Sequence, residues 1–462
     1  MVAFKHVFKN IRRFTSLIYI AIAISFLCIG VTACSSESSS SPLDDLNSVE
    51  ASKEFKYNYE LLYFYYNDAK KYLEAPENYI GKIKDNALAE YSIPWDYYDI
   101  YFMYNQMNDP YTQYVDPSRS LAVMQSISSS KPRMDPGFEY DISGTTNDFY
   151  ITSVIKNSPA DKAGLKVGDQ ITAIEGVAPI SEVVIDRLST ATEGDVVIYT
   201  VKRDSQTLTL PVVLTTYYTP TVELSFKDSI PIIKILEFTK TTSSDSGTYG
   251  EFVNYLHETE KYKATIIDLR NNGGGDGDQC IPMAQLLLSK GDTTVGVIST
   301  DADTIHMKQT YDTTFTTNKF DGFAKDRYYV FLVNGKSASC SELFLLSVTM
   351  NKKYPVVGTT TYGKGIGQLT IPTPSFSLAI ITSLKVIDKN FKTYHKYGIE
   401  PDFVIHDEEQ ALNKAVELAK GMTYIRTAEY GSVNTGHFAK MAAEQDSMPG
   451  FYFLPEEYRK KF

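Results

Sequence analysis

Three short segments of this chain carry residues that could act together in catalysis. The first is the stretch "NGKSASCSELFLLS" at 334–347, in which Ser339 comes just before an apolar run typical of a buried helix. The free N–H groups and the dipole at the start of a helix favour negative charge, which suits a nucleophile whose attack creates an oxyanion. Serine is also a preferred helix cap, so this stretch alone is compatible with a purely structural role.

The second segment is a glycine-rich turn, "IIDLRNNGGGDGDQ" at 266–279, directly after an apolar strand pattern. Consecutive glycines let the backbone approach another group closely and direct its N–H groups into a site. A phosphate-binding loop is the alternative. Neither the GxxxxGK[ST] motif nor the Rossmann spacing is present, so the turn does not predict a nucleotide site.

The third segment is "TTTYGKGIGQ" at 359–368, in which Lys364 stands between Gly363 and Gly365 and Gln368 follows four residues later. A solvated surface lysine is the ordinary interpretation. Glycines on both sides favour a lysine that is fitted into a confined site. No histidine lies near Ser339 in sequence, so the three segments by themselves leave open which residue would accept the serine proton.

Alternating strands and helices must position these three segments. Apolar strand patterns occupy 230–238, 263–270, 327–333 and 354–358, and helical patterns occupy 247–260 and 341–350. Two later strands over 377–388 and 398–405 and a helix over 407–421 follow. This alternation predicts a sheet covered by helices.

Two regions with other sequence patterns precede this α/β part of the chain. From about residue 50 to 126 apolar and aromatic residues recur at intervals of three and four, which predicts core-facing helices. The stretch "SSSKPRMDPG" at 128–137 is typical of a linker. Short strand patterns with one or two helices then run from 137 to 214.

The region of short strands at 137–214 resembles a PDZ domain, most specifically in "SPADKAGLKVGDQITAIEGV" at 158–177. This resemblance implies that an extended chain end binds by strand addition and that backbone N–H groups hold its terminal carboxylate. The implied carboxylate loop is Gly137, Phe138, Glu139 and Tyr140, with the Glu139 side chain turned away from the bound anion. A PDZ-shaped spacer that binds nothing is the alternative.

Taken together, the three segments resemble the carboxyl-terminal processing (tail-specific) proteases, a serine–lysine peptidase family. The family's "SASASE" is "SASCSE" here, its "GKG" lysine follows the serine by 25 residues as Lys364 follows Ser339, and its "DLRNNPGG" is "DLRNNGGG". The segment "DPYTQYVDP" at 109–117 is similar to the one before the family's PDZ domain. The resemblance spans roughly residues 57–421.

The resemblance implies a role for each candidate residue. Ser339 would be the nucleophile, Lys364 the general base and Gln368 the residue that orients the amine. The backbone N–H of Cys340 and one from Gly274 or Gly275 would form the oxyanion hole. A lysine amine is protonated at pH 7, so burial must lower its pKa to about 7–8, a perturbation of roughly 4 kcal/mol. Cys340 replaces the family's alanine, but only its backbone is needed.

The first residues resemble a bacterial lipoprotein signal. Four basic residues precede the apolar run 17–31, and small residues lead directly into Cys34. Cleavage before Cys34 would leave it as a lipidated first residue, with the serine-rich segment after it as a flexible tether. An uncleaved membrane anchor is the alternative. Cys280 and Cys340 would be the cysteines left in the exported body, and the sequence does not say whether they pair.

Composition excludes several other classes of protein. The formal net charge of -11 provides no electrostatic footprint for nucleic acid. The histidines are scattered without ligand spacing and no CxxC motif occurs, so neither a metal nor another cofactor is expected. A Ser-His-Asp esterase is disfavoured because the GxSxG motif is missing.

These observations predict a multidomain α+β protein with a helical N-terminal region, a PDZ domain and a crotonase/ClpP-like α/β protease core. The expected parts are a lipoprotein signal peptide (1–33), a flexible tether (34–50), the helical region (51–130), the PDZ domain (134–215), the serine protease core (216–421) and a C-terminal tail (422–462). The expected function is that of a serine endopeptidase of the bacterial cell envelope, anchored by lipid at Cys34, with an acyl-enzyme mechanism. Its substrates would be exported proteins recognised by their free C-termini. The alternative is a catalytically silent PDZ-bearing, peptide-binding lipoprotein.

Overall fold

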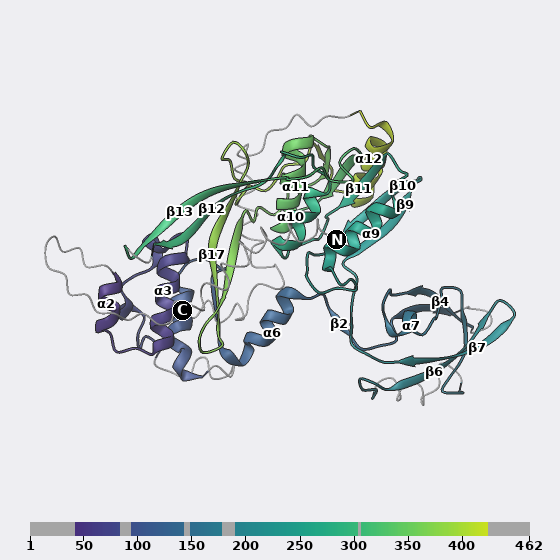
Figure 1. Ribbon diagram of the computed structural model, residues 1–462, viewed down its shortest axis with the longest axis horizontal. Coiled ribbons are helices and arrows are strands. Elements are labelled where there is room, and N and C mark those ends of the chain that lie inside the picture. Colours follow the sequence, from purple (N-terminus) through teal and green to yellow (C-terminus); the bar gives the residue numbers. More distant parts are fainter. Residues whose placement is uncertain (1–41, 84–93, 143–147, 178–189, 304–305, 424–462) are drawn as a thin grey trace.

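The computed structural model describes residues 42–83, 94–142, 148–177, 190–303 and 306–423 (Figure 1). The expected signal segment, Cys34 and residues 424–462 of the expected tail lie outside the described residues. Within the described ranges the chain forms a helical N-terminal region, a small β domain and an α/β core, in the order that the sequence predicted. Every helix in these ranges is too short or too polar to span a bilayer.

The N-terminal region packs around aromatic side chains. Helix α3 (Lys53–Tyr65) begins after Ser52, whose hydroxyl accepts the N–H of Phe55. Phe55, Tyr59 and Leu62 are buried, at the three- and four-residue spacing of one helix face. The other elements are α2 (Pro42–Ser48), α4 (Ala69–Tyr72), α5 (Tyr98–Asn105), α6 (Pro117–Ser128), the 3-10 turns Pro76–Asn78 and Trp95–Tyr97, and strand β1 (Gln113–Val115).

The expectation of a flexible tether over 34–50 is wrong for its second half. Residues 42–48 form helix α2, and Leu43 and Leu46 are buried in the aromatic core of the N-terminal region. Burial of these two apolar side chains stabilises a helix that the serine-rich composition of the segment did not predict. Residues 34–41 lie outside the described part of the chain.

Six strands form the central sheet of the core, in the order β18-β15-β14-β11-β10-β9. All neighbours are parallel except β9 and β10. Helices α9, α10 and α11 cover one face and α12 covers the other (Figure 1), so the inner strands β11, β14 and β15 are buried on both sides and are mostly apolar, whereas the edge strand β9 is largely exposed. The bounds are β9 (Val222–Lys227), β10 (Ile230–Ile235), β11 (Ala264–Asp268), β14 (Tyr328–Val333), β15 (Val356–Gly358), β18 (Phe403–Val404), α9 (Gly247–Glu258), α10 (Gly277–Gln285), α11 (Cys340–Lys352) and α12 (Glu408–Gly421).

A second sheet joins the core to the N-terminal region. Its order is β1-β17-β12-β13, with β16 also paired to β17, and its longest strands run from the core towards α3 (Figure 1). The bounds are β12 (Thr293–Asp303), β13 (Lys308–Thr317), β16 (Ile366–Pro372) and β17 (Leu378–Ile387). The hairpin of β12 and β13 was not predicted, because β13 is mostly exposed and its threonines and charged residues show no apolar alternation.

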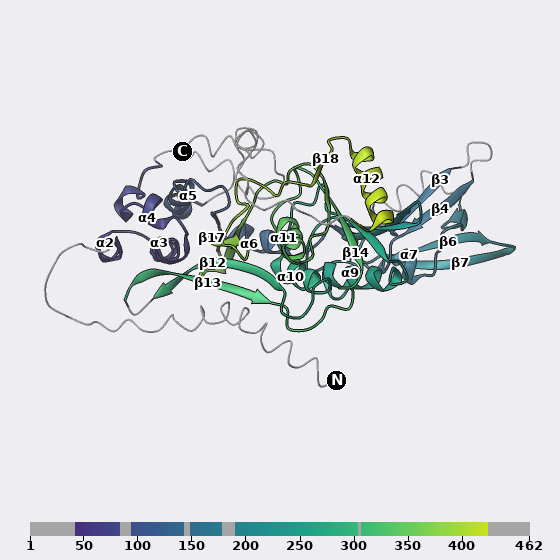
Figure 2. The ribbon, with the colours of Figure 1, turned by 90° about the horizontal axis from the view of Figure 1, so that it is seen from above.

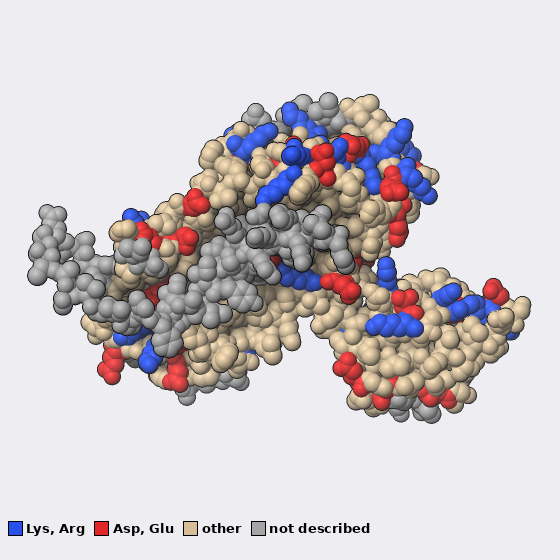
Figure 3. Space-filling view, viewed as in Figure 1, with Lys and Arg blue, Asp and Glu red and all other residues tan. Residues whose placement is uncertain are grey.

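The small β domain lies at the end of the molecule opposite α3 (Figure 2) and forms a separate lobe with its own core (Figure 3). Its sheet order is β3-β4-β5-β6-β7, and a notch separates the lobe from the rest of the molecule in the space-filling view. The linker expected over 128–137 contains β2 (Pro132–Arg133), which pairs with β8 (Tyr217–Tyr218) where the chain leaves the lobe. The other bounds are β3 (Phe138–Ile142), β4 (Phe149–Val154), α7 (Pro159–Lys162), β5 (Gln170–Ile174), β6 (Val196–Arg203) and β7 (Gln206–Val213).

Candidate active site

The three segments singled out in the sequence meet at one edge of the central sheet. The glycine turn follows β11, the Ser339 stretch follows β14 and the Lys364 stretch follows β15. These three strands are parallel neighbours, so their carboxyl ends lie side by side. This is the place where open α/β sheets bind their ligands.

Ser339 stands at the turn between β14 and helix α11. Its φ of 54° lies in the left-handed region, which is a strained conformation for a residue with a side chain. The backbone of Gly274 packs directly against it: a Cβ on Gly274 would lie 2.6 Å from the Ser339 Cβ and 2.9 Å from the Cys340 nitrogen. Only glycine fits there, which accounts for the glycine turn of the second segment.

A buried carboxylate ties the serine segment to the lysine segment. Oε2 of Glu342 accepts the backbone N–H of Ser339 at 2.9 Å and that of Lys364 at 2.8 Å. Oε1 accepts the Thr361 hydroxyl at 2.5 Å and the Gly363 N–H at 2.6 Å. Burial raises the pKa of Glu342 to about 7, against the opposing effect of these four donors. The carboxylate thus holds the two segments together.

Lys364 is almost fully removed from water, with 2% of its surface exposed. Burial lowers the pKa of its amine from 10.5 to about 8, and the nearby carboxylates of Asp109 and Glu342 oppose this shift. A lowered pKa of this size makes a neutral amine available near neutral pH. The glycine after the lysine, Gly365, packs against the backbone of His395. A Cβ on Gly365 would lie 2.9 Å from the His395 nitrogen.

The aromatic ring of Tyr111 faces the lysine from the N-terminal region. The Lys364 Nζ lies 4.4 Å from the ring centroid, and the Tyr111 hydroxyl is 3.2 Å from that of Tyr362. Tyr111 belongs to the segment 109–117 that precedes the small β domain. The N-terminal region therefore contributes one wall of the lysine's surroundings.

The oxyanion hole expected from the sequence needs the backbone N–H of Cys340 and that of one glycine. The Gly274 N–H donates to Oδ1 of Asn272 at 2.8 Å, so it is already engaged. Among the described residues, the N–H groups of Cys340, at the first position of α11, and of Gly275 have no hydrogen-bond acceptor. Of the two glycines that the sequence left open, Gly275 is therefore the better candidate.

Gln368 lies in strand β16, beside the lysine turn. Its amide nitrogen donates to the Thr382 hydroxyl at 3.1 Å, and the Thr382 N–H donates to the hydroxyl of Thr112. With the nitrogen engaged, the carbonyl Oε1 is the end of the amide that can accept from an amine.

Two parts of the chain match known protein families. Residues 229–405 match peptidase family S41, and residues 122–214 match the PDZ domain. The core belongs to peptidase family S41.

Curated relatives of this chain carry the name probable CtpA-like serine protease. The one from Staphylococcus haemolyticus is 29% identical over 341 residues, which are 71% of this chain and 65% of the relative. The one from Staphylococcus epidermidis is 29% identical over 318 residues, which are 67% of this chain and 61% of the relative. The chain thus spans a little less than two thirds of the length of these relatives.

Solved structures with similar chains include the photosystem II D1 C-terminal processing protease. That chain is 20% identical and has a TM-score of 0.46, with 80% of this chain and 98% of that chain covered. A putative S41 protease from Bacteroides fragilis is 15% identical with a TM-score of 0.44, covering 81% of this chain and 99% of that one.

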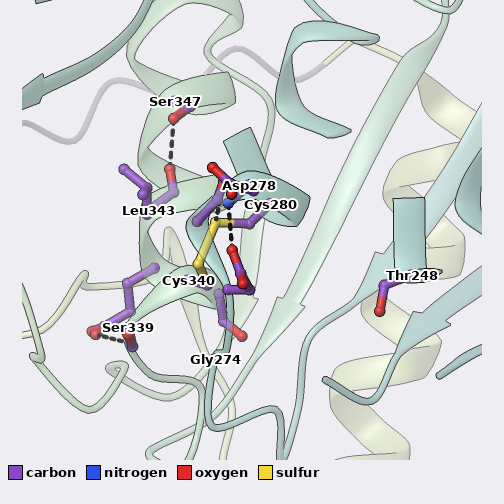
Figure 4. Close-up of a disulfide and its surroundings, with 12 residues drawn as sticks. Thr248, Gly274, Asp278, Cys280, Ser339, Cys340, Leu343 and Ser347 are labelled. Carbon is purple, nitrogen blue, oxygen red and sulfur yellow. Dashed lines mark hydrogen bonds between the residues drawn. A yellow bond between two sulfur atoms is a disulfide. The ribbon is translucent and has the colours of Figure 1, made fainter. Parts of the chain in front are cut away.

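The two cysteines of the S41 core form a disulfide, a question that the sequence left open. Cys280 of α10 and Cys340 of α11 are bonded, with their Cα atoms 5.9 Å apart, and both are buried. Ser339 and Gly274 lie at one end of this bridge (Figure 4). The disulfide therefore joins the helix that follows the glycine turn to the helix that begins after the serine.

The carboxylate loop expected in the PDZ domain is only partly a loop. Gly137 precedes the sheet with a φ of 85°, and a Cβ there would lie 2.3 Å from that of Ser158. Phe138, Glu139 and Tyr140 are not in the loop but in strand β3, because they pair with β4. The Ser153 hydroxyl donates to Glu139 at 3.1 Å, which directs that carboxylate over the neighbouring strand.

Strand β3 is nevertheless suited to peptide binding. It is the end strand of the described PDZ sheet, so one side of its backbone is available for an added strand. The sheet to which β3 belongs lies in the separate lobe, away from helix α11 (Figure 1).

Sequence reasoning missed three residues of the site. Glu342 stands in "SASCSE", and a glutamate three residues after a serine was readable as a capping-box pattern. Tyr111 and His395 gave no local signal, since only the fold brings them to Lys364. Burial lowers the pKa of His395 to about 4, so its imidazole is neutral at pH 7.

Among the described residues, no group of acidic, histidine or cysteine side chains has the arrangement of a metal site.

Proposed function

We propose that this protein is a serine-type endopeptidase that uses Ser339 as its nucleophile and Lys364 as its general base. The observation that carries the proposal is the pairing of a strained serine at a helix start with a buried lysine, both tied to Glu342. An amine with a pKa of about 8 can accept a proton near neutral pH, whereas an ordinary lysine cannot.

The reaction follows from these positions. The Ser339 hydroxyl attacks the carbonyl carbon of a peptide bond and its proton passes to the Lys364 amine. The oxyanion accepts hydrogen bonds from the N–H groups of Cys340 and Gly275. The C–N bond then breaks, and the Lys364 ammonium gives its proton to the leaving amine. Water, deprotonated by the same amine, hydrolyses the acyl-enzyme and restores the serine.

In this mechanism Gln368 orients the base without adding charge. Its Oε1 would accept an N–H of the Lys364 amine while Nε2 stays bonded to Thr382. A carboxylate at this position would raise the lysine pKa and leave the amine protonated.

The PDZ domain would select protein substrates by their free C-termini. An extended chain end would add to β3, and its carboxylate would meet the backbone N–H groups at Gly137 and the start of the strand. The alternative, a silent peptide-binding protein, predicts binding without cleavage.

Export to the bacterial cell envelope with a lipid anchor on Cys34 is part of the proposal. Support comes from the signal-like pattern before Cys34 and from the disulfide, because disulfides persist in oxidising compartments. Cys34→Ala should leave the precursor uncut. Incorporation of labelled fatty acid into that variant would contradict the anchor.

The decisive experiment incubates purified protein and its Ser339→Ala variant with an unstructured protein substrate. Cleavage by the wild type alone, together with labelling of Ser339 by a fluorophosphonate probe, is the expected result. Equal cleavage by both proteins, or binding of the substrate without cleavage by either, would refute the proposal.

A further inference from the structure

The segment 109–117 reaches the S41 core through several independent contacts. Strand β1 pairs with β17, with Gln113 opposite Ile380. The Thr112 hydroxyl donates to Asp109 at 2.7 Å and accepts the N–H of Thr382 at 3.0 Å. The Tyr111 N–H donates to Asp109 at 3.0 Å. The backbone around Tyr111 is therefore fixed on both sides.

This anchoring leads the Tyr111 ring to the lysine amine. The Lys364 Nζ lies 4.4 Å from the ring centroid, and Tyr111 and Lys364 are 5% and 2% exposed. The Tyr111 hydroxyl meets that of Tyr362, which is itself 5% exposed and packs against Ala338 beside the serine. Two tyrosines thus cover the space between the N-terminal region and the lysine turn.

We propose that Tyr111 is a positioning residue that covers the amine of Lys364 and keeps water away from it, so that the N-terminal region completes the active site. This inference rests on the proposed function, in which Lys364 must be neutral to accept the serine proton. A charged amine is stabilised by water, so a side chain that excludes water from the amine favours its neutral form.

Other charged or titratable groups also face the Lys364 amine and influence its pKa. The carboxylates of Asp109 and Glu342 favour the ammonium form, and a protonated His395 would disfavour it. The Tyr111 ring face also attracts a cation, which favours the ammonium. Exclusion of water acts in the opposite direction and is the largest cause of the lowered lysine pKa. Removing the ring should therefore raise the lysine pKa.

The test compares Tyr111→Ala, Tyr111→Gln and Tyr111→Phe with the wild type. Alanine opens the space to water, and glutamine keeps much of the volume but brings a hydrated amide to the amine. Phenylalanine is the matched control, because it keeps the ring and loses only the hydroxyl. Each protein is assayed for peptide hydrolysis and for the rate of fluorophosphonate labelling of Ser339 from pH 6 to pH 10. Labelling does not depend on peptide binding.

In the alanine and glutamine variants, the rise of the rate with pH should have its midpoint about one pH unit higher than in the wild type. Their rates should be about tenfold below wild type at pH 7 and recover at the highest pH. The phenylalanine variant should keep the wild-type midpoint. A thermal unfolding scan identifies a variant that has not folded, and the glutamine variant then carries the test.

Midpoints equal to that of the wild type in both the alanine and the glutamine variant would overturn the inference. So would a phenylalanine variant displaced as far as alanine, because the hydroxyl rather than the cover would then matter. A wild type that neither cleaves nor labels at Ser339 would instead refute the proposed function, so the two failures are distinguishable.

Discussion

The backbone N–H groups of Ser339 and Lys364 donate to one and the same oxygen, Oε2 of Glu342, at 2.9 and 2.8 Å. The two residues are 25 positions apart in sequence and follow different strands of the central sheet. A single buried carboxylate therefore sets the position of the proposed nucleophile relative to that of the proposed base. Its other oxygen fixes the turn on which the lysine stands.

Glu342→Gln should lower kcat at least tenfold with little change in KM. A glutamine offers one oxygen and one NH2 group, and the NH2 group would face backbone N–H donors that it cannot pair with. The unpaired buried donors should also lower the free energy of unfolding by about 1–3 kcal/mol. Steady-state kinetics and urea unfolding measure the two effects. A variant with wild-type kcat would show that the carboxylate does not position the site.

Lys364→Arg should be as inactive as Lys364→Ala. Arginine keeps the positive charge but does not release its proton near pH 7, so it cannot act as a base. Ser339→Ala should be equally inactive and the double variant no worse, because a nucleophile and its base act as a unit. If the hydrolysis rate of Lys364→Arg were within about tenfold of the wild-type rate, a difference of roughly 1.4 kcal/mol in activation free energy, the base would lie elsewhere.

The rate of the wild-type protein should rise with pH through about 8. The lysine pKa is lowered to about 8, so the amine is mostly protonated at pH 7 and mostly neutral at pH 9. His395, with its pKa lowered to about 4, is neutral across this range and should not contribute. A His395→Gln variant serves as the control and should keep the same midpoint. A midpoint near 10.5 would mean that the lysine is not desolvated in solution.

Removal of the disulfide should affect stability more than activity. The double variant Cys280→Ala/Cys340→Ala should lose about 2–4 kcal/mol in free energy of unfolding, because the bond closes a long loop between residues 60 positions apart. Its kcat at 25 °C should stay within about threefold of wild type, since the proposed oxyanion hole would use only the backbone N–H of residue 340. The double variant avoids leaving one free thiol. A large fall in kcat without loss of stability would contradict this expectation.

Peptides with a free C-terminus should be cleaved in preference to their amidated counterparts at low concentration. The backbone N–H groups at Gly137 and the start of β3 offer a charge-assisted hydrogen bond that an amide does not accept as well. Its loss should weaken binding by about 1.5–3 kcal/mol. Kinetics over a concentration series with matched free-acid and amidated peptides measure the difference. Equal values of kcat/KM would mean that the PDZ domain is a spacer in this protein.

The sequence by itself determined the parts and most of the candidate chemistry. The order of a helical region, a part with short strands and an α/β core follows from local periodicity, because helix and strand spacing is a property of neighbouring residues. The assignment of the middle part as a PDZ domain came from its resemblance to that family over residues 158–177. Ser339, Lys364 and the glycine turn were recognisable because each stands at a strand end with its own local pattern. Helix α2 was missed, since its stability comes from burial of Leu43 and Leu46 against residues distant in the chain.

Only the tertiary structure decided how these parts meet. The sequence could not assign Glu342, Tyr111 or His395 to the lysine, because contacts between residues far apart in the chain depend on how the parallel strands are ordered. It could not choose between Gly274 and Gly275, because that choice depends on whether the side chain of Asn272 occupies a backbone N–H. The pairing of Cys280 with Cys340 likewise required the two helices to be placed side by side. Local sequence patterns identify the candidate residues, whereas tertiary packing determines which groups each of them contacts.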